Sequence, residues 1–488
     1  MGRPSLNGIR GNLRLRNRLL IVLVGAGLAV LPACELVNNE DSFVDLATVG
    51  NISYSRHVQP LLDRECGACH GGAAPDAGLD LTSWSGIVEG SDAGGVVVPR
   101  RADRSPLIQM LDALQPTRHP LDVTNPRAGV APDTLTAVEI AFLKRWVDEG
   151  AKNDTGAEPY ADADSLLYVA VQDDASIYQI DTRRNVVAAI VDLTDLGYSA
   201  SAKPHHVVVE PDGSFWYVSL IGESKVLKFD SDNQVVGEAD FETPGMLALH
   251  PSLDLLFVGR SLSAPAPPSS IGRITRSTMA IEEVQVLFPR PHALAVDPDG
   301  GFVHTASLGE NQLMTVEAAG STVSFTPVAG PAHAFVQFAV SSQRDRMYAT
   351  TQLSNRVLVF DISDPANPVQ DSAIPVNAAP WHPAITPDQS ELWFGNNLAN
   401  TITVLDLDQL TIAKVIFGNG VAGPHGSAVR GDGRYVYISN RNLNGTYSPR
   451  HDFGTNPQPG TVVVIDRTSQ SIVRVIETGP YAAGMGIR

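Results

Sequence analysis

Two short strand patterns alternate along the last two thirds of this 488-residue chain, and each occurs seven times. The first is an aromatic-apolar run, such as Trp216-Tyr217-Val218. The second follows a polar turn and is an apolar run that ends in an acid, such as 357–361. Copies of the first pattern lie at 167–169, 216–218, 256–258, 302–304, 346–348, 392–394 and 436–438. A period of about 40 to 50 residues built from short β-runs is typical of propeller blades. The repeated pattern therefore predicts that residues 164–488 form an all-β propeller of seven blades.

The two ends of this region predict how the ring closes. The region begins with the aromatic-apolar run at Leu167, which is of the kind that forms the second strand of a blade. The chain finishes at 484–488 on a run of the kind that forms the first strand of a blade. We therefore expect the C-terminus to supply the missing strand of the first blade, since closure removes exposed sheet edges.

A different signature stands near the start of the chain, at Cys66-Gly67-Ala68-Cys69-His70. CxxCH is the attachment signature of haem c, because two thiols on one helical turn can each bond a haem vinyl group and the adjacent histidine can bind the iron. A thioredoxin-like reading lacks a preceding strand, and a zinc site lacks a second pair of ligands, since Cys34 is the only other cysteine. The sequence predicts one haem c, held by Cys66 and Cys69 with His70 on the iron.

The residues around this signature predict a small all-α domain over 51–153. An apolar stretch leads directly into Cys66, and Ser105 followed by Pro106 is a typical helix start. Thr136 and Glu139 form a capping-box pattern ahead of a helix that Gly150 ends. The predicted fold class is thus a two-domain chain, with a small helical domain followed by a seven-bladed propeller.

The helical domain resembles the cytochrome c domains of planctomycete-type and deltaproteobacterial proteins. The resemblance rests on 58–62, 66–71, 78–81, 96–99, 105–107 and 146–151. In that family a Met-Pro pair before the last helix usually supplies the second axial ligand, and here the corresponding residues are His119-Pro120. The resemblance therefore implies His119 as the second ligand and a bis-histidine haem. Met110 is the runner-up, and His57 or no protein ligand are the remaining alternatives.

The N-terminus predicts export. Residues 1–33 combine arginines with the apolar run 19–31, which suits a signal peptide better than a membrane-spanning helix. The run closes on Leu31-Pro32-Ala33-Cys34, which resembles a lipoprotein lipobox, although Pro32 departs from the usual small residue. The resemblance implies lipidation at Cys34, a tether over 34–50 and an outer-membrane anchor, with periplasm or cell surface left open. An ordinary signal peptide with a chance cysteine is the alternative.

The charge of the chain limits its partners. The net charge is −18, and the first 33 residues carry five arginines and no acids, so the remainder stands at −23. This balance excludes nucleic acid, whose binding depends on neutralising phosphates. It favours a basic redox partner protein, with membrane contact only through the lipid anchor.

The propeller repeat resembles the YVTN family, and its histidines invite two interpretations. Pro-His pairs open several inner strands, which places His205, His292 and His425 at equivalent positions of blades 2, 4 and 7, with His206, His333 and His382 near them in sequence. One interpretation is a metal or catalytic site, by analogy with propeller enzymes such as nitrous-oxide reductase. The other is that each imidazole bonds loop backbone. Because three of seven positions do not easily converge across a wide channel, the sequence favours the second.

One insertion and three functions remain open. The insert from Arg441 to Gly460 is long for a compact repeat, so it is expected to cap the channel mouth or contact the helical domain.

The favoured function is electron transfer through one haem, with the propeller as docking platform or scaffold. The alternatives are a haem-relayed oxidoreductase with a metal or substrate site in the channel, and a surface-binding propeller with an accessory haem domain. No residue constellation in the sequence assigns an enzymatic reaction.

Overall fold

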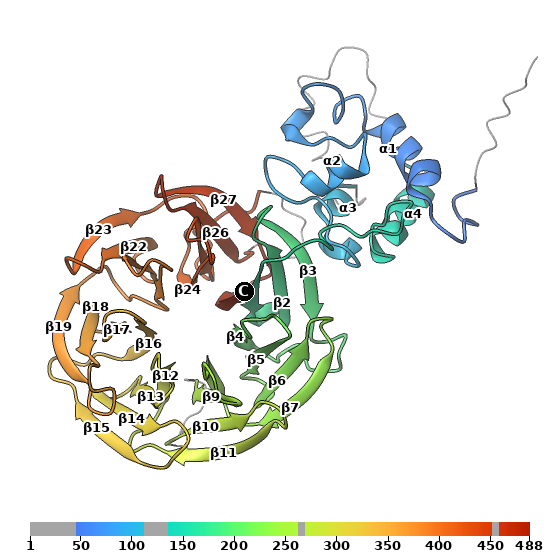
Figure 1. Ribbon diagram of the computed structural model, residues 1–488. Coiled ribbons are helices and arrows are strands. Elements are labelled where there is room, and N and C mark those ends of the chain that lie inside the picture. Colours follow the sequence, from blue (N-terminus) through green and yellow to red (C-terminus); the bar gives the residue numbers. More distant parts are fainter. Residues whose placement is uncertain (1–44, 112–134, 262–268, 451–457) are drawn as a thin grey trace, which may run out of the picture. The chain divides into compact units, whose positions relative to one another are not determined.

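The computed structural model describes residues 45–111, 135–261, 269–450 and 458–488 (Figure 1). The predicted lipidation site Cys34, the predicted ligand His119 and the predicted leader and most of the tether lie outside these residues. Within them, no helix is both long enough and apolar enough to span a membrane.

Short helices make up the first part of the described chain. A π-helical turn, η1, continues into α1 and runs to the residue before Cys66. The helices are η1 (Tyr54–Val58), α1 (Gln59–Glu65), α2 (Trp84–Glu89), α3 (Pro106–Leu111) and α4 (Ala137–Asp148), with 3-10 turns η2 (Asp76–Gly78) and η3 (Ala102–Arg104). Their apolar faces meet in one core that includes Val58, Leu62, Ile87, Leu143 and Trp146.

The predicted helix starts are confirmed. The Thr136 hydroxyl accepts from the backbone N–H of Glu139 while the Glu139 carboxylate accepts from the Thr136 N–H, so both donors at the start of α4 are satisfied. Ser105 precedes α3, and its hydroxyl is bonded to the backbone of Val98. These local bonds orient α3 and α4, whose apolar faces pack against the segment that carries Cys66.

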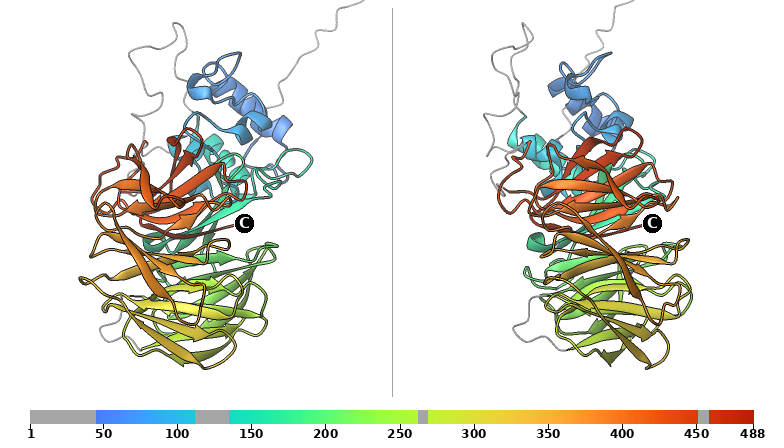
Figure 2. Two further views of the ribbon diagram at one scale, coloured as in Figure 1. Left: turned by 60° about the vertical axis from the view of Figure 1, so that its left-hand side comes forward. Right: turned by 90° about the vertical axis from the view of Figure 1, so that its left-hand side faces the viewer.

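Seven four-stranded antiparallel sheets follow one another around a ring, which Figures 1 and 2 show from three directions. Blades 1 to 4 consist of β28 (Ala482–Ile487), β1 (Leu166–Val171), β2 (Ser176–Asp181) and β3 (Val186–Asp192); β4 (Pro204–Val209), β5 (Phe215–Leu220), β6 (Lys225–Asp230) and β7 (Val235–Asp240); β8 (Pro244–Leu249), β9 (Leu255–Arg260), β10 (Ser270–Thr275) and β11 (Ala280–Gln285); and β12 (Pro291–Val296), β13 (Phe302–Ser307), β14 (Gln312–Glu317) and β15 (Val323–Pro327). Blades 5 to 7 consist of β16 (Phe335–Val340), β17 (Arg346–Thr351), β18 (Arg356–Asp361) and β19 (Val369–Pro375); β20 (Ala384–Ile385), β21 (Glu391–Asn396), β22 (Thr401–Asp406) and β23 (Thr411–Ile416); and β24 (Pro424–Val429), β25 (Tyr435–Asn440), β26 (Thr461–Asp466) and β27 (Ser471–Glu477). The predicted fold class, a helical region followed by a seven-bladed propeller, is confirmed.

Continuous apolar runs form the middle strands because neighbouring blades cover both of their faces. Trp216 of β5 is fully buried; it stacks on Phe229 of its own blade and packs against Tyr168 of blade 1. Equivalent clusters fill the spaces between the other blades. The outermost strands are more exposed, as the burial pattern of β15 shows.

The last strand closes the ring as predicted. β28 pairs antiparallel with β1, with Leu167 opposite Ile487 and Val169 opposite Met485. The Ser165 hydroxyl also donates to the carbonyl of Arg488 at 2.7 Å. Blade 1 is thus built from both ends of the propeller chain.

Tight packing of β28 against β4 makes a specific prediction. A Cβ at Gly486 would lie 2.7 Å from the carbonyl oxygen of Val207, a backbone atom that cannot rotate away. We expect Gly486→Ala to lower the free energy of unfolding by about 1 to 3 kcal/mol in urea titrations. Gly431→Ala is the matched control, since nothing lies within 4 Å of its Cβ position. Equal stability of the two variants would contradict the closure described here.

Candidate functional site

The CxxCH segment continues the turn at the end of α1. The Cys66 N–H donates to the Leu62 carbonyl at 2.8 Å, and the His70 N–H donates to the Cys66 carbonyl at 2.8 Å. Cys66 and Cys69 are both half-buried, and neither is in a disulfide. The two thiols and the imidazole therefore project from one helical turn, as covalent attachment of a porphyrin with an adjacent axial ligand requires.

The ring of His70 is oriented by a backbone acceptor. Its Nδ1 lies 3.2 Å from the carbonyl oxygen of Asp76, so Nδ1–H is the donor and the neutral ring carries its lone pair on Nε2. Metal-bound histidines usually have their second nitrogen held in this way, which sets both the tautomer and the ring orientation. His70 is thus suited to bind iron through Nε2.

The Cys66 thiol lies in surroundings that favour its protonated form. Burial raises its pKa to about 11, and the charges of Glu65 and Cys69 act in the same direction. Thiolate ligands of structural zinc require the opposite shift, because the thiol must lose its proton to bind.

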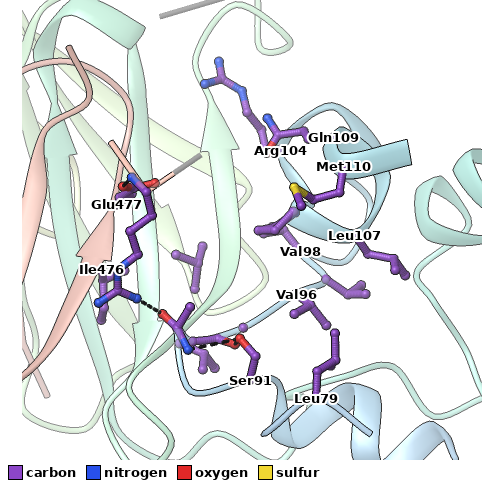
Figure 3. A pocket seen from close by; sticks show the side chains of 18 of the residues that line it. Leu79, Ser91, Val96, Val98, Arg104, Leu107, Gln109, Met110, Ile476 and Glu477 are labelled. Carbon is purple, nitrogen blue, oxygen red and sulfur yellow. Dashed lines mark hydrogen bonds between the residues drawn. The ribbon is translucent and has the colours of Figure 1, made fainter. Parts of the chain in front are cut away.

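An apolar cavity of about 320 Å³ lies beside Cys66 and His70. Its helical wall is formed mainly by Leu79, Leu81, Val96, Val97, Leu107 and Met110. Figure 3 shows the aliphatic side chains and the Met110 thioether around this space. Cys69, on the same turn, does not line the cavity. An apolar pocket next to the Cys66 thiol and an oriented histidine, with the second thiol one turn position away, fits a haem.

Blades 1 and 7 of the propeller form the opposite wall. Tyr178 and Val187 line it from β2 and β3, and Ile476 and Glu477 line it from β27 (Figure 3). The propeller therefore forms the side of the cavity that the helical segment leaves uncovered.

Ion pairs hold this wall in place. Arg104, which lines the cavity from the helical side, pairs with Asp174 of blade 1 at 2.7 Å, and both side chains are largely buried. Arg101 pairs with Asp192 at 3.2 Å, and each side chain is 15% exposed. Because these pairs are partly desolvated, removing one partner would leave an uncompensated charge that is partly shielded from water.

The three candidates for a second iron ligand fall in different places. Met110 on α3 lines the same cavity as His70, and its sulfur is directed into it (Figure 3). His57 does not line the cavity; its Nδ1 accepts from the Ser53 N–H at 3.0 Å and its ring packs against Phe142. His119 lies outside the described residues and stays a prediction.

These observations agree with the comparison to known families. Residues 66–118 match the planctomycete cytochrome c family. That segment, called the cytochrome c segment below, begins at Cys66 and reaches past α3. No curated protein sequence matches the chain.

The propeller resembles several solved structures in fold alone. A protein from Bacteroides fragilis assigned as a 6-phosphogluconolactonase has a TM-score of 0.51 at 12% identity, over 68% of this chain and all of that one. A streptogramin B lyase has a TM-score of 0.47 at 16% identity, over 56% and 86% of the two chains. Kuenenia stuttgartiensis hydrazine synthase has a TM-score of 0.45 at 18% identity, over 57% and 87%. The first of these matches, at 12% identity, shows a likeness of fold alone.

The histidines at the start of the inner strands converge, which the sequence had not predicted. The ring centroid of His205 lies 5.8 Å from that of His292 and 5.6 Å from that of His425. Two further rings join them, with His382 at 4.5 Å from His425 and His206 at 6.0 Å from His382. The expectation that imidazoles from blades 2, 4 and 7 stay apart was wrong. We call His205, His206, His292, His382 and His425 the channel histidines.

Backbone irregularities explain the convergence. The pairing of β4 with β5 shifts register between Pro204 and Val207, and that of β24 with β25 shifts between Pro424 and Ser427. A bulge adds a residue to one strand and re-aims the side chains beside it. The histidine after each proline lies in the bulge, so its side chain does not follow the simple alternation of a strand.

Hydrogen bonding divides the propeller histidines into two groups. His333 uses both ring nitrogens, towards Ser354 and Ala329, and His250 does so towards Gly300 and the turn at Ser252. Two channel histidines also bond backbone, since His292 Nδ1 donates to the Val336 carbonyl at 2.7 Å and His206 Nδ1 accepts from the Leu247 N–H at 3.3 Å. In contrast, both nitrogens of His425 are buried without a partner. The backbone-bonding role expected from the sequence therefore applies to His292, His206, His333 and His250, and not to His425.

The insert of the last blade reaches both of its expected contacts. Arg441 donates to the Tyr481 hydroxyl at 3.1 Å and lies over the Trp381 ring, next to the channel histidines. Arg450 donates to the carbonyl of Ala93 in the cytochrome c segment at 2.6 Å. His451 lies outside the described residues.

The ion pair across the cavity makes a testable prediction. Removing the charge with Arg104→Gln leaves the largely buried Asp174 carboxylate unpaired, and we expect a loss of about 1 to 3 kcal/mol in the free energy of unfolding. The matched control is Arg100→Gln, whose side chain is 62% exposed and pairs with Glu158, a residue that precedes the first strand of the propeller. Thermal melts followed by haem absorbance and by tryptophan fluorescence would measure the loss. An Arg104→Gln protein as stable as the control would contradict the assigned contact.

Proposed function

We propose that the chain is a c-type cytochrome that transfers single electrons through one haem, with the propeller as scaffold and docking domain. The haem would be bonded to Cys66 and Cys69, with His70 on the iron. The observation that carries this proposal is the combination of the CxxCH turn, the Nδ1–H bond of His70 to Asp76 and the apolar cavity beside them. When bound, the haem would supply the one-electron chemistry.

The residues of this chain would tune that chemistry. Aliphatic side chains exclude water from the cavity, and Tyr178, Ile476 and Glu477 add a propeller wall to it. A dry, covered haem changes its charge with little solvent reorganisation, and its potential depends on burial and on the axial ligands. The propeller would thus contribute directly to the environment of the haem, beyond presenting a surface to partners.

Two variants distinguish His119 from Met110 as the second axial ligand. If His119 binds the iron, His119→Ala should abolish the low-spin spectrum, while Met110→Leu leaves the spectrum and the midpoint potential unchanged. If Met110, which lines the cavity, binds the iron instead, Met110→Leu should abolish the low-spin spectrum and His119→Ala should leave the spectrum and the midpoint potential unchanged. Thioether ligation raises the potential relative to bis-histidine ligation, so redox titration separates the cases. His57→Ala serves as the control, and a high-spin wild type would contradict both.

Charge would govern the encounter with a partner. With a net charge of −18, we expect the rate of electron transfer to a basic acceptor protein to fall roughly tenfold between about 0.01 and 0.15 M ionic strength, as the Debye length shrinks from about 30 to about 8 Å. Stopped-flow mixing with the reduced protein measures this. An acidic acceptor of similar size should show the opposite trend, and a rate with no salt dependence would contradict electrostatic steering.

We also propose that the mature protein is exported and anchored through Cys34 to the outer membrane, in the periplasm or at the cell surface. Two features support this: the lipobox-like sequence at 31–34, and the covalent haem, since haem c is attached outside the cytoplasm. Mass spectrometry of the N-terminal peptide would test the anchor, with Cys34→Ser expected to release the protein from membranes.

A second function is favoured by one observation. The channel histidines form a buried polar cluster, which suits an oxidoreductase whose substrate reacts in the channel while the haem relays electrons. The turn η4 (Gln172–Asp174) links the two places, since Gln172 is bonded to His205 and Asp174 is paired with Arg104 of the cavity wall.

A further inference from the structure

We propose that His205, His382 and His425 bind one first-row transition-metal ion at the mouth of the propeller channel. The proposal is independent of the haem, and it rests on the positions of the rings, their unpartnered nitrogens and their burial. Imidazole is a ligand for copper, zinc, iron and nickel, and three histidines with an open position form a familiar site for such ions.

The ring positions fit a shared ion. The three centroid separations are 5.6 Å for His205–His425, 6.3 Å for His205–His382 and 4.5 Å for His382–His425. The point equidistant from the three centroids therefore lies about 3.2 Å from each. A nitrogen–metal bond of about 2.0 to 2.1 Å places the centroid of a bound imidazole about 3.2 Å from the ion. One ion at that point would be at bonding distance from all three rings once each ring turns its nitrogen inward.

Rotation of the rings would complete the site. As placed, the three rings pack edge to face, and no three histidine, cysteine or acidic side chains in the described part of the chain are already set around an ion. Turning an imidazole about its Cβ–Cγ bond moves its nitrogens while the centroid stays nearly in place, so the centroid distances given above are kept during such turns.

The unpartnered ring nitrogens favour a metal-binding role of these three histidines over a purely structural one. His205 Nε2, His382 Nε2 and both nitrogens of His425 are buried without a partner. The exposed fractions of the three side chains are 7%, 4% and 0%. A buried polar atom without a partner is costly, and a bound ion would satisfy one on each ring. His304 shows that one unpartnered nitrogen is insufficient evidence, since its Nε2 is also unpartnered but its ring packs against no other imidazole among the described residues.

Neighbouring residues supply the surroundings of such a site. Gln172 lies 2.8 Å from His205 Nδ1, and with its amide oxygen turned towards the ring it would accept from Nδ1–H while Nε2 binds the ion. His292 and His206 lie at 5.8 Å from His205 and 6.0 Å from His382, and are the nearest additional ligands. Arg441 would disfavour a bare cation but would favour an anion on an open position of the ion, because it lies against Trp381 at the same mouth.

The test uses the full haem-loaded protein, stripped of loose metals with a chelator. Titration calorimetry with Cu²⁺, the divalent ion that imidazole sites bind most tightly, should give one site per chain. His425→Gln and His382→Gln should each weaken binding by more than about 100-fold, since loss of even an outer-sphere partner costs roughly 10- to 100-fold. Gln172→Leu should fall within that smaller range. Electron paramagnetic resonance of the Cu²⁺ complex should show splitting from at least three nitrogens.

Matched controls keep the result interpretable. His304→Gln removes a buried propeller histidine with one unpartnered nitrogen outside the cluster, and it should bind Cu²⁺ as the wild type does. An unchanged haem spectrum and circular dichroism show that each variant is folded. Absence of Cu²⁺ and Zn²⁺ binding by the wild type would overturn the proposal, as would binding that survives in both His425→Gln and His382→Gln. A normal haem spectrum in a protein that binds no added metal would refute this site and leave the proposed electron transfer intact.

Discussion

The antiparallel pairing of β28 with β1 determines where both candidate sites can form. It joins residues more than 300 positions apart, Leu167 and Ile487, so that blade 7 is adjacent to blade 1. Only then do β2, β3 and β27 lie together as the wall of the cavity beside Cys66, and only then does the inner strand of blade 7 approach that of blade 2. Without closure the inner sheet edge of β1 would be exposed, and the channel histidines would lose their enclosure.

Much of the fold was predictable because it follows periodic or local signals. The paired strand patterns specify seven blades, and the capping box at Thr136 and Glu139 specifies the start of α4. The wall of the cavity was not predictable, since Arg104 and Asp174 are ordinary surface residue types until the two parts of the chain meet. Convergence of the histidines was missed because the bulges after Pro204 and Pro424 break the alternation on which strand predictions depend. His382 was expected only to lie near the three equivalent histidines in sequence, yet the repeated Pro-His pair was a usable signal for His205, His292 and His425.

The two sites place opposite demands on their surroundings. At the cytochrome c segment, aliphatic side chains surround a space beside thiols and a histidine whose orientation one carbonyl sets. In the channel, polar rings are packed together with several nitrogens unpartnered, at a cost of about 1 to 3 kcal/mol for each such group. The interblade clusters, which bury large aromatic side chains throughout the ring, supply the stability that tolerates this cost.

The composition of the cavity wall has a consequence for the order of assembly. Export of the chain N-terminus first, as proposed above, would bring the CxxCH segment out of the cytoplasm before β27 and β28. During that interval Cys66 would have only the helical half of the cavity around it, and both thiols would be accessible for attachment of haem. Pairing of β28 with β1 would then bring blade 7 against blade 1 and cover the group. A closing strand so late in the propeller would thereby separate cofactor loading from enclosure.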